Sequence, residues 1–281
     1  MNYRHAFHAG NFADVVKHAV LARIVAHLKE KPAAFRAIDT HAGAGLYDLA
    51  GPEASRTGEW REGVGKLVTA TLDRAVRTLL APYLEAIAAL NAGPLKLYPG
   101  SPMLLQHWLR PQDRLIACEK EPAAASALTT RLRGDKRAKA VAIDGYTALN
   151  AYVPPKERRG LVLIDPPFEQ PDEFDALALG FTAAHRKWPT GIYALWYPVK
   201  DARETEKFSR RLTRLGISRV LQAELILPAR DGLRGSGLIL VNPPWRLEDE
   251  LGVLLPALLG ILSEDASDAG RTPVRWLTAE R

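Results

Sequence analysis

Short apolar runs recur along the chain, and each is closed by polar, glycine or proline residues. Runs of this length are typical of buried β-strands. Helix-patterned segments, such as residues 123–134 and 175–188, separate most of them. The expected strands lie within residues 35–45, 114–122, 138–146, 159–167 and 191–198. Alternation of strands and helices predicts a parallel, doubly wound α/β sheet.

Two further apolar segments, residues 218–227 and 235–243, are joined by a link too short for a crossover connection. Strands joined in this way must pair antiparallel. Five parallel strands followed by such a pair is the layout of class I S-adenosylmethionine-dependent methyltransferases. We therefore expect an α/β, Rossmann-like fold whose final strand is antiparallel.

The segment between the first and second expected strands is too long for a simple loop. Residues 47–100 contain the helix-like stretch KLVTATLDRAVRTLLAPYLEAIAAL and end in YPGSP. Long connections without structure of their own are uncommon in compact domains. We predict a small helical insertion subdomain at 47–100, within a methyltransferase domain formed by residues 1–46 and 101–281.

Two apolar runs end in nearly the same tetrapeptide. LVLIDPPFEQ (161–170) contains Asp-Pro-Pro-Phe, and LILVNPPWRL (238–247) contains Asn-Pro-Pro-Trp. Both fit the catalytic motif of amino-group methyltransferases, Asp/Asn-Pro-Pro-aromatic. Ligands bind at the carboxyl ends of parallel strands, where Asp165 lies, whereas the antiparallel last strand carries Asn242 to the opposite edge. We predict that DPPF is catalytic and that NPPW is a rigid strand exit whose Trp245 packs on the bottom of the sheet.

The chemistry of DPPF suits transfer to a conjugated amine, whose lone pair is a poor nucleophile. The Asp165 carboxylate and the Pro166 carbonyl can accept the amino hydrogens and free the lone pair. The prolines fix the backbone that aims both acceptors. Phe168 offers a face on which an extruded base can lie. No metal is required for this reaction, and we expect none.

The other strand ends carry residues suited to a nucleoside cofactor. Gly43 and Gly45 permit close backbone approach after the first strand. Glu119 ends the second strand, where an acid can accept ribose hydroxyls. Asp144 and Gly145 end the third, where an acceptor and a free N–H suit an adenine edge. Taken singly these are also typical of surface acids and Asx turns, but their order together with DPPF predicts a site for S-adenosylmethionine.

The N-terminal segment combines polar residues with a helix pattern. Asn11 is a plausible N-cap for a helix that runs to about Lys29. Lys17 falls inside the apolar stripe of this helix, which is costly unless its ammonium reaches a polar cavity. We therefore expect Lys17 and His18 to point toward the site; the alternative is that Lys17 extends along the edge of the core. Possible zinc ligands cluster here, namely His5, His8, Asp14 and His18, but their spacing matches no standard pattern.

Composition narrows the class of partner and the compartment. The formal charge of +6 and pI near 9.4 favour a polyanion such as nucleic acid, although many basic proteins bind none. Cys118 is the single cysteine, so a disulfide framework is impossible and a reducing compartment is expected. The sequence has no apolar signal segment and no stretch of membrane-span length. We expect a cytoplasmic protein without membrane contact.

Several motifs together resemble one known family. They are YRHAFHAGNFADVVKH, DTHAGAGLY, RTGEW, YPGSP, IDPPF, YALWYP and NPPW. The chain is similar over nearly its whole length to the bacterial ribosomal RNA large-subunit methyltransferase J family, which forms N6-methyladenine at adenine 2030 of 23S ribosomal RNA. The sequence has Phe168 where the family often has Tyr; both can stack on a base.

The resemblance implies a monomer with 23S ribosomal RNA as partner and S-adenosylmethionine as cofactor. The cofactor contacts that it implies are His18, His41, Ser101, Glu119, Asp144, Gly145 and Asp165. Asp165 is also the implied proton acceptor, and Tyr3 an implied contact of the substrate RNA. His5 and Lys17 match the same N-terminal motif and are expected near the RNA.

The residues alone leave other functions open. The acceptor could be guanine N2, cytosine N4, a DNA adenine or a protein glutamine, because the DPP-aromatic motif serves them all. A nicotinamide-dependent oxidoreductase is disfavoured by DPPF and by the missing third glycine. A catalytically silent RNA-binding protein would fit the basic clusters 131–140, 156–160 and 210–214, but the intact DPPF argues against it.

The link between the last two strands is basic and glycine-rich. It spans residues 227–237 and carries Arg230 and Arg234. Because the penultimate strand ends at the cofactor edge, we expect this loop to hang over the same mouth as DPPF. It is predicted to clamp the RNA backbone; the alternative is a hairpin tip whose charges serve only solubility.

Overall fold

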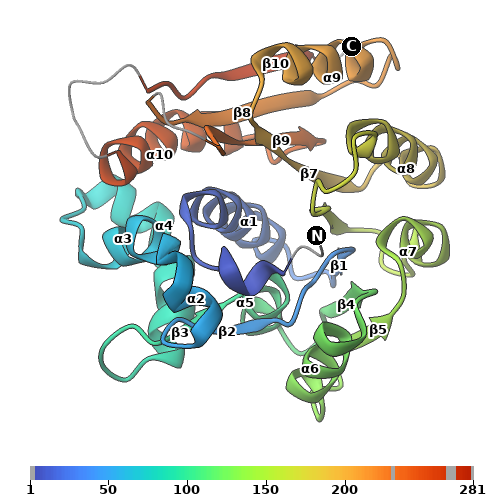
Figure 1. Cartoon of the computed structure of the whole chain (residues 1–281). Helices are drawn as coiled ribbons and strands as arrows, with labels where there is room; N and C mark the ends of the chain where they lie inside the picture. The colour runs from blue at the N-terminus through green and yellow to red at the C-terminus, as the bar shows by residue number, and fades with distance from the viewer. Residues whose placement is uncertain (1–3, 229–231, 264–269, 280–281) are drawn as a thin grey trace.

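The computed structural model describes residues 4–228, 232–263 and 270–279. Its centre is an eight-stranded sheet in the order β10-β8-β9-β7-β6-β1-β4-β5 (Figure 1). The strands are β1 (Arg36–Asp39), β4 (Arg114–Glu119), β5 (Ala138–Ala142), β6 (Gly160–Ile164), β7 (Ile192–Val199), β8 (Val220–Ile226), β9 (Gly235–Val241) and β10 (Val274–Thr278).

The strand directions confirm the predicted fold class. The strands β5, β4, β1, β6 and β7 are parallel. β9 lies between β7 and β8 and is antiparallel to both. The outer strand β10, which pairs antiparallel with β8, was not predicted. It is half exposed, so its sequence lacks the apolar run by which the other strands were found.

Helices cover both faces of the sheet (Figure 1). On one face lie α1 (Phe12–Lys29), α5 (Ser101–Trp108), α6 (Pro122–Leu132) and α10 (Leu247–Leu262); on the other lie α7 (Gly145–Tyr152), α8 (Glu173–Lys187) and α9 (Ala202–Thr213). Successive strand residues point to opposite faces. Accordingly Leu161 and Leu163 belong to the first core, and Val162 to the second.

Helix α1 forms the centre of the first face. Fourteen of its eighteen residues are buried, as expected for a helix that is covered on all sides. The Asn11 side chain accepts a hydrogen bond from the Asp14 amide at 3.0 Å, so the predicted N-cap is confirmed. Ahead of it, residues His5–Phe7 form a 3₁₀ turn, η1.

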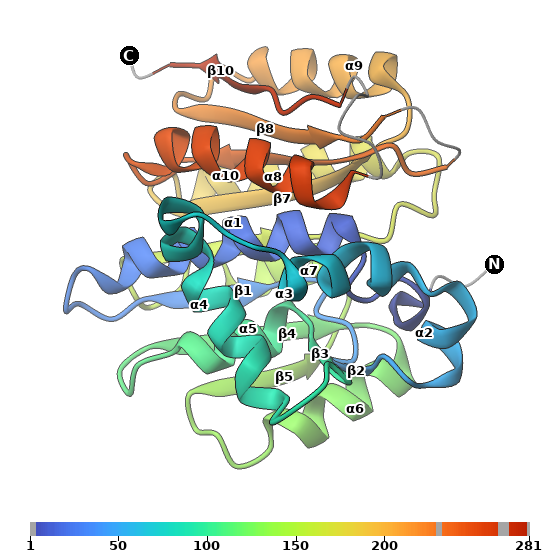
Figure 2. The same ribbon diagram turned by 90° about the vertical axis from the view of Figure 1, so that its left-hand side faces the viewer.

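The segment between β1 and β4 contains mostly helix. Its elements are β2 (Leu46–Asp48), α2 (Pro52–Thr57), the π-helical turn η2 (Arg61–Gly65), α3 (Lys66–Thr69), α4 (Arg74–Leu90) and β3 (Leu97–Pro99). α4 and η2 pack against α1 (Figure 2), and Val64, Leu67 and Tyr83 join the same core as α1. The antiparallel β2–β3 ribbon was not predicted. That residues 47–100 form a subdomain of their own stays a prediction.

The NPPW segment departs from expectation in one respect. Asn242 follows β9, and its side-chain amide donates to the carbonyls of Pro189 and Gly191 at the start of β7, which is the edge opposite to Asp165. Trp245, however, does not pack beneath the sheet. Its ring is 67% exposed and stacks with the Arg246 guanidinium at 4.5 Å. The expected packing of Trp245 on the bottom of the sheet was therefore wrong, because its ring lies in solvent against Arg246.

No helix within the described residues is long and apolar enough to cross a membrane.

Candidate active site

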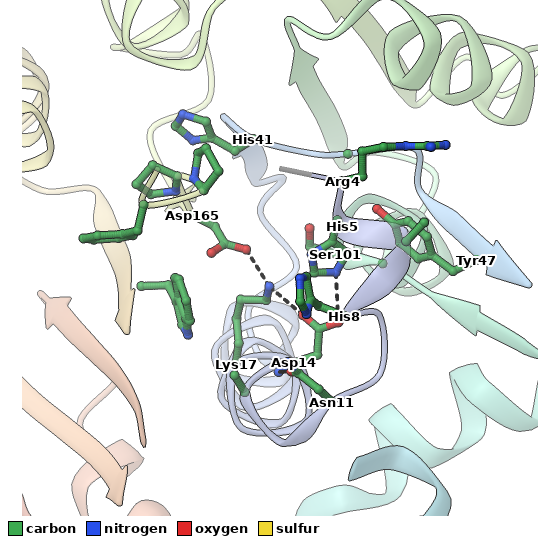
Figure 3. A pocket seen from close by; sticks show the side chains of 18 of the residues that line it. Arg4, His5, His8, Asn11, Asp14, Lys17, His41, Tyr47, Ser101 and Asp165 are labelled. Atoms are coloured by element: carbon green, nitrogen blue, oxygen red, sulfur yellow. Dashed lines mark hydrogen bonds and ion pairs between the residues drawn. The ribbon is translucent and has the colours of Figure 1, made fainter. Parts of the chain in front are cut away.

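A cavity of about 1310 Å³ opens at the carboxyl ends of β1, β4, β6 and β7. Most of the predicted site residues line it (Figure 3), namely His5, Lys17, His18, His41, Ser101, Glu119, Gly145, Asp165, Pro166 and Phe168. Asp144 does not line it, because its carboxylate caps α7 by accepting from the Thr147 amide at 3.0 Å. Tyr3 and Arg230 lie outside the described residues.

The loop of residues 227–237, which was predicted to hang over the mouth, forms part of the cavity wall. Gly232 and Leu233 line the cavity, whereas Arg234 is exposed and does not. The Arg234 amide donates to the Val199 carbonyl at 3.1 Å, which holds this part of the link beside the end of β7. The structure therefore places the link at the predicted edge, and the RNA clamp stays a prediction.

A buried ionic chain crosses the floor of the cavity (Figure 3). The Lys17 ammonium lies 2.5 Å from Asp165 Oδ2 and 2.8 Å from Asp14 Oδ1. The other oxygen of Asp14 contacts His5 Nε2 at 3.0 Å and accepts the Gly10 amide at 2.9 Å. Lys17 thus points into the site, as its place in the apolar stripe predicted.

Each charged group in this ionic series stabilises the charged form of its neighbours. Burial alone would lower the pKa of Lys17, but Asp14 and Asp165 together outweigh it and hold that pKa well above its usual value. Burial would likewise raise the pKa of Asp14, but His5 and Lys17 keep it well below the normal range. Lys17 is therefore a cation between two acceptors, in a place where water is largely excluded.

Aromatic rings form the wall next to Asp165. Phe168 has a positive φ of 50°, an uncommon conformation for a bulky residue that is typical of functional sites. Its ring lies 4.9 Å from Phe174 and 5.8 Å from Trp196, both edge-to-face. Trp196 lines the cavity, lies 5.8 Å from Lys17 Nζ and donates its indole N–H to Ser236 at 2.9 Å.

The opposite part of the cavity is built from backbone and one acid. Glu119 accepts the amide of Gly43 at 2.8 Å and that of Glu121 at 2.7 Å, which fixes its carboxylate at the end of β4. Gly43 has φ of 61°, and a Cβ there would lie 2.4 Å from the Tyr47 hydroxyl. A Cβ on Gly145 would lie 2.5 Å from the His41 ring. Because Gly43 and Gly145 have no side chains, their backbone can lie this close to the side chains of Tyr47 and His41.

Three buried polar atoms have no hydrogen-bond partner among the described residues, namely His18 Nε2, Asp39 Oδ2 and Trp60 Nε1, and of these three residues His18 lines the cavity. The other His18 nitrogen contacts the Tyr98 hydroxyl at 2.7 Å, and burial lowers the His18 pKa to about 3, so the ring is neutral. Burial also raises the pKa of Asp39 to about 7, against a hydrogen bond from Ser101. Buried orphan groups of this kind are expected where a ligand completes the site.

Known proteins are similar to this chain in sequence and in fold. The family model described as "Ribosomal RNA large subunit methyltransferase D, RlmJ" matches residues 32–278. The chain belongs to this family.

Two curated relatives are named "Ribosomal RNA large subunit methyltransferase J". The one from Escherichia coli K12 is 40% identical over 284 residues, and the one from Haemophilus influenzae is 39% identical over 285; each alignment covers 100% of both chains. A crystal structure of a Legionella pneumophila protein is 33% identical, has a TM-score of 0.87 and covers 96% of this chain and 98% of that one. The resemblance inferred from the motifs is confirmed.

A methyltransferase of this family uses S-adenosylmethionine, and the residues present fit that group. Glu119 would accept the ribose hydroxyls, and Gly43 and Gly145 line the cavity with backbone alone. His18 Nε2 would gain the polar partner that it lacks. The individual contacts stay predictions.

Replacing Glu119 by Ala should weaken S-adenosylmethionine binding by about 1.5–3 kcal/mol, because a charged acceptor of the ribose is removed. Glu119→Gln should lose less, since the amide keeps one neutral acceptor. Isothermal titration calorimetry on both variants measures the difference. Unchanged affinity in Glu119→Ala, with unchanged melting, would mean that the ribose does not lie at the end of β4.

Two features of the site escaped the sequence analysis. Trp196 could not be placed, because its position beside Asp165 depends on the register in which Ile164 pairs with Leu195. Asp14 was noted only as a helix-start residue and a possible zinc ligand, yet it pairs with Lys17. Within the described residues, no group of His, Cys, Asp and Glu side chains is arranged to hold a metal ion.

Proposed function

We propose that the protein transfers a methyl group from S-adenosylmethionine to N6 of an adenine in 23S ribosomal RNA, of the adenine 2030 type. The observation that carries this proposal is the Asp165 carboxylate held by buried Lys17 at a cavity that Pro166 and Phe168 also line. Family membership supports the RNA of the large subunit as acceptor.

Each residue of the motif has a part in the reaction. Lys17 holds Oδ2 of Asp165, so Oδ1 is the oxygen that accepts an N6 hydrogen of adenine. The Pro166 carbonyl accepts the other hydrogen, and the nitrogen lone pair turns toward the donor. S-adenosylmethionine, when bound, supplies the electrophilic methyl group. Asp165 then takes the proton that the methylated nitrogen releases.

The acceptor base must leave its stack to reach Asp165. Phe168, with its ring fixed against Phe174 and Trp196, offers a face for the extruded base. Unpaired or weakly paired adenines in RNA loops are the easiest to extrude. We further propose that the protein acts as a monomer in the cytoplasm.

The acceptor class is tested by incubating the protein with methyl-labelled S-adenosylmethionine and four acceptors in parallel. These are an unmodified 23S ribosomal RNA transcript, a 16S transcript, duplex DNA of the 23S sequence and bulk protein. Label is expected in the 23S transcript alone. Preferential label in DNA or protein would overturn the proposed substrate.

The link of residues 227–237 yields a separate prediction. Replacing both Arg230 and Arg234 by Ala should weaken RNA binding and reduce the slope of log K against log salt by roughly 0.9 for each duplex phosphate that these side chains neutralise. Cofactor affinity should not change, because the link faces the RNA side of the mouth. Filter binding across several salt concentrations and a cofactor titration check both statements. An unaltered slope would show that the link is no clamp.

A further inference from the structure

The insertion holds the N-terminal segment in place through its own backbone and side chains. The Val64 amide donates to the Gly10 carbonyl at 2.8 Å, and the Thr57 hydroxyl donates to the Phe7 carbonyl. A Cβ on Gly63 would lie 2.1 Å from the Gly10 oxygen, so the two segments approach as closely as backbone allows. The RTGEW motif of residues 56–60 is therefore in contact with the YRHAFHAGN motif.

Glu59 is a charged group at this contact, as are Arg4 and Glu53, which pair at 2.7 Å. The carboxylate oxygens of Glu59 lie 2.9 and 3.0 Å from His8 Nδ1, and Glu59 accepts the Asn11 side-chain amide at 3.0 Å. The His8 pKa is raised, first by its hydrogen bond to Glu59. The Glu59 side chain is 38% exposed, so an ion pair here contributes little to global stability.

Asn11 uses both ends of its amide. Its Nδ2 donates to Glu59, while its Oδ1 accepts the Asp14 amide and so caps α1. Asp14 in turn pairs with Lys17, and Lys17 with Asp165. A continuous series of contacts therefore runs from the insertion to the catalytic carboxylate, and every member after Glu59 is largely buried.

We infer that Glu59 is a positioning residue for methyl transfer: by fixing the amide of Asn11, it orients the start of α1 and thereby sets Lys17 against Asp165. The inference rests on the proposed function and gives the insertion a part in the reaction. Glu59 acts through Asn11 and Asp14, so its effect falls on the rate of the chemical step rather than on binding.

The first test compares Glu59→Ala with Glu85→Ala, an exposed acid on α4 in the same insertion. Glu59→Ala should lower the single-turnover rate on a 23S transcript by about tenfold, the size expected when a charge-assisted hydrogen bond is removed. Its melting temperature, cofactor affinity and RNA affinity should match wild type. Glu85→Ala should be unchanged in every measurement.

The second test moves the carboxylate from position 59 to position 11. Asn11→Asp keeps the helix cap, since Asp caps as well as Asn, but sets two carboxylates against each other. Glu59→Gln removes only the charge. The double variant restores a complementary pair, because the new glutamine amide can donate to the new aspartate while its oxygen still accepts from His8. We expect Asn11→Asp to be slow, and the double variant to recover most of the wild-type rate.

Hydrogen exchange of the amides of residues 12–17 gives a readout that needs no acceptor. Faster exchange there in Glu59→Ala and Asn11→Asp, reversed in the double variant, is expected even if the RNA substrate were misassigned. Normal exchange and an undiminished rate in Glu59→Ala would overturn the inference. So would a double variant no faster than Asn11→Asp, or a Glu59→Ala defect confined to RNA or cofactor affinity.

Discussion

Replacing Asp165 by Asn should lower the single-turnover rate of methyl transfer by roughly 100- to 10,000-fold, the range over which a positioned acid or base contributes. Asn is nearly isosteric, so the fold and the cavity should persist. It keeps one acceptor oxygen but cannot take the proton from the methylated nitrogen. The rate is measured with labelled cofactor and a 23S transcript, beside circular dichroism and a cofactor titration.

Asn242→Ala is the matched control, since it alters the corresponding residue of the second tetrapeptide. Asn242 bonds to Pro189 and Gly191 and has φ of 53°, so its loss should reduce stability and leave the rate near wild type. Equal rate losses in the two variants at temperatures where both are folded would contradict the assignment of DPPF as the sole catalytic motif.

Replacing Lys17 by Met should lower the free energy of unfolding by about 3–5 kcal/mol, the usual cost of removing one member of a buried ion pair. Lys17 is only 5% exposed in its side chain, and its loss leaves the carboxylates of Asp14 and Asp165 facing each other without a cation. Activity should be lost as well, because Asp165 is no longer oriented. Urea unfolding at neutral pH measures the stability.

Lys66→Met serves as the comparison for Lys17. Lys66 pairs with Glu62, which is 51% exposed, so the change should cost about 0–1 kcal/mol. A Lys17→Met variant as stable as Lys66→Met would show that the ionic chain across the cavity floor contributes nothing to the fold.

The sequence predicted those parts of the molecule that local pattern encodes. Buried strands appear as apolar runs, so the seven strands of the core layout were found, while β10 was missed because it is half exposed. Lys17 was directed to the site by a physical conflict, a charge within an apolar stripe. The family resemblance supplied Ser101, which no local pattern marked.

What the sequence could not provide are contacts between distant segments. Glu59 meets His8 and Asn11 across about fifty positions, and nothing local in RTGEW indicates that partner. Asp144 caps α7 through one carboxylate oxygen, which the sequence did not indicate, and its contact with the cofactor stays a prediction. Trp245 was expected to pack on the bottom of the sheet, yet it is largely exposed and its ring stacks with the Arg246 guanidinium.

The central claim is that Asp165 and its neighbours methylate N6 of adenine. Its most direct test is to methylate a 23S transcript with labelled cofactor, digest the RNA completely and identify the labelled nucleoside by mass spectrometry. N6-methyladenosine is the predicted product, and it should be absent from the reaction with Asp165→Asn. N2-methylguanosine or N4-methylcytidine as the labelled product would contradict the account.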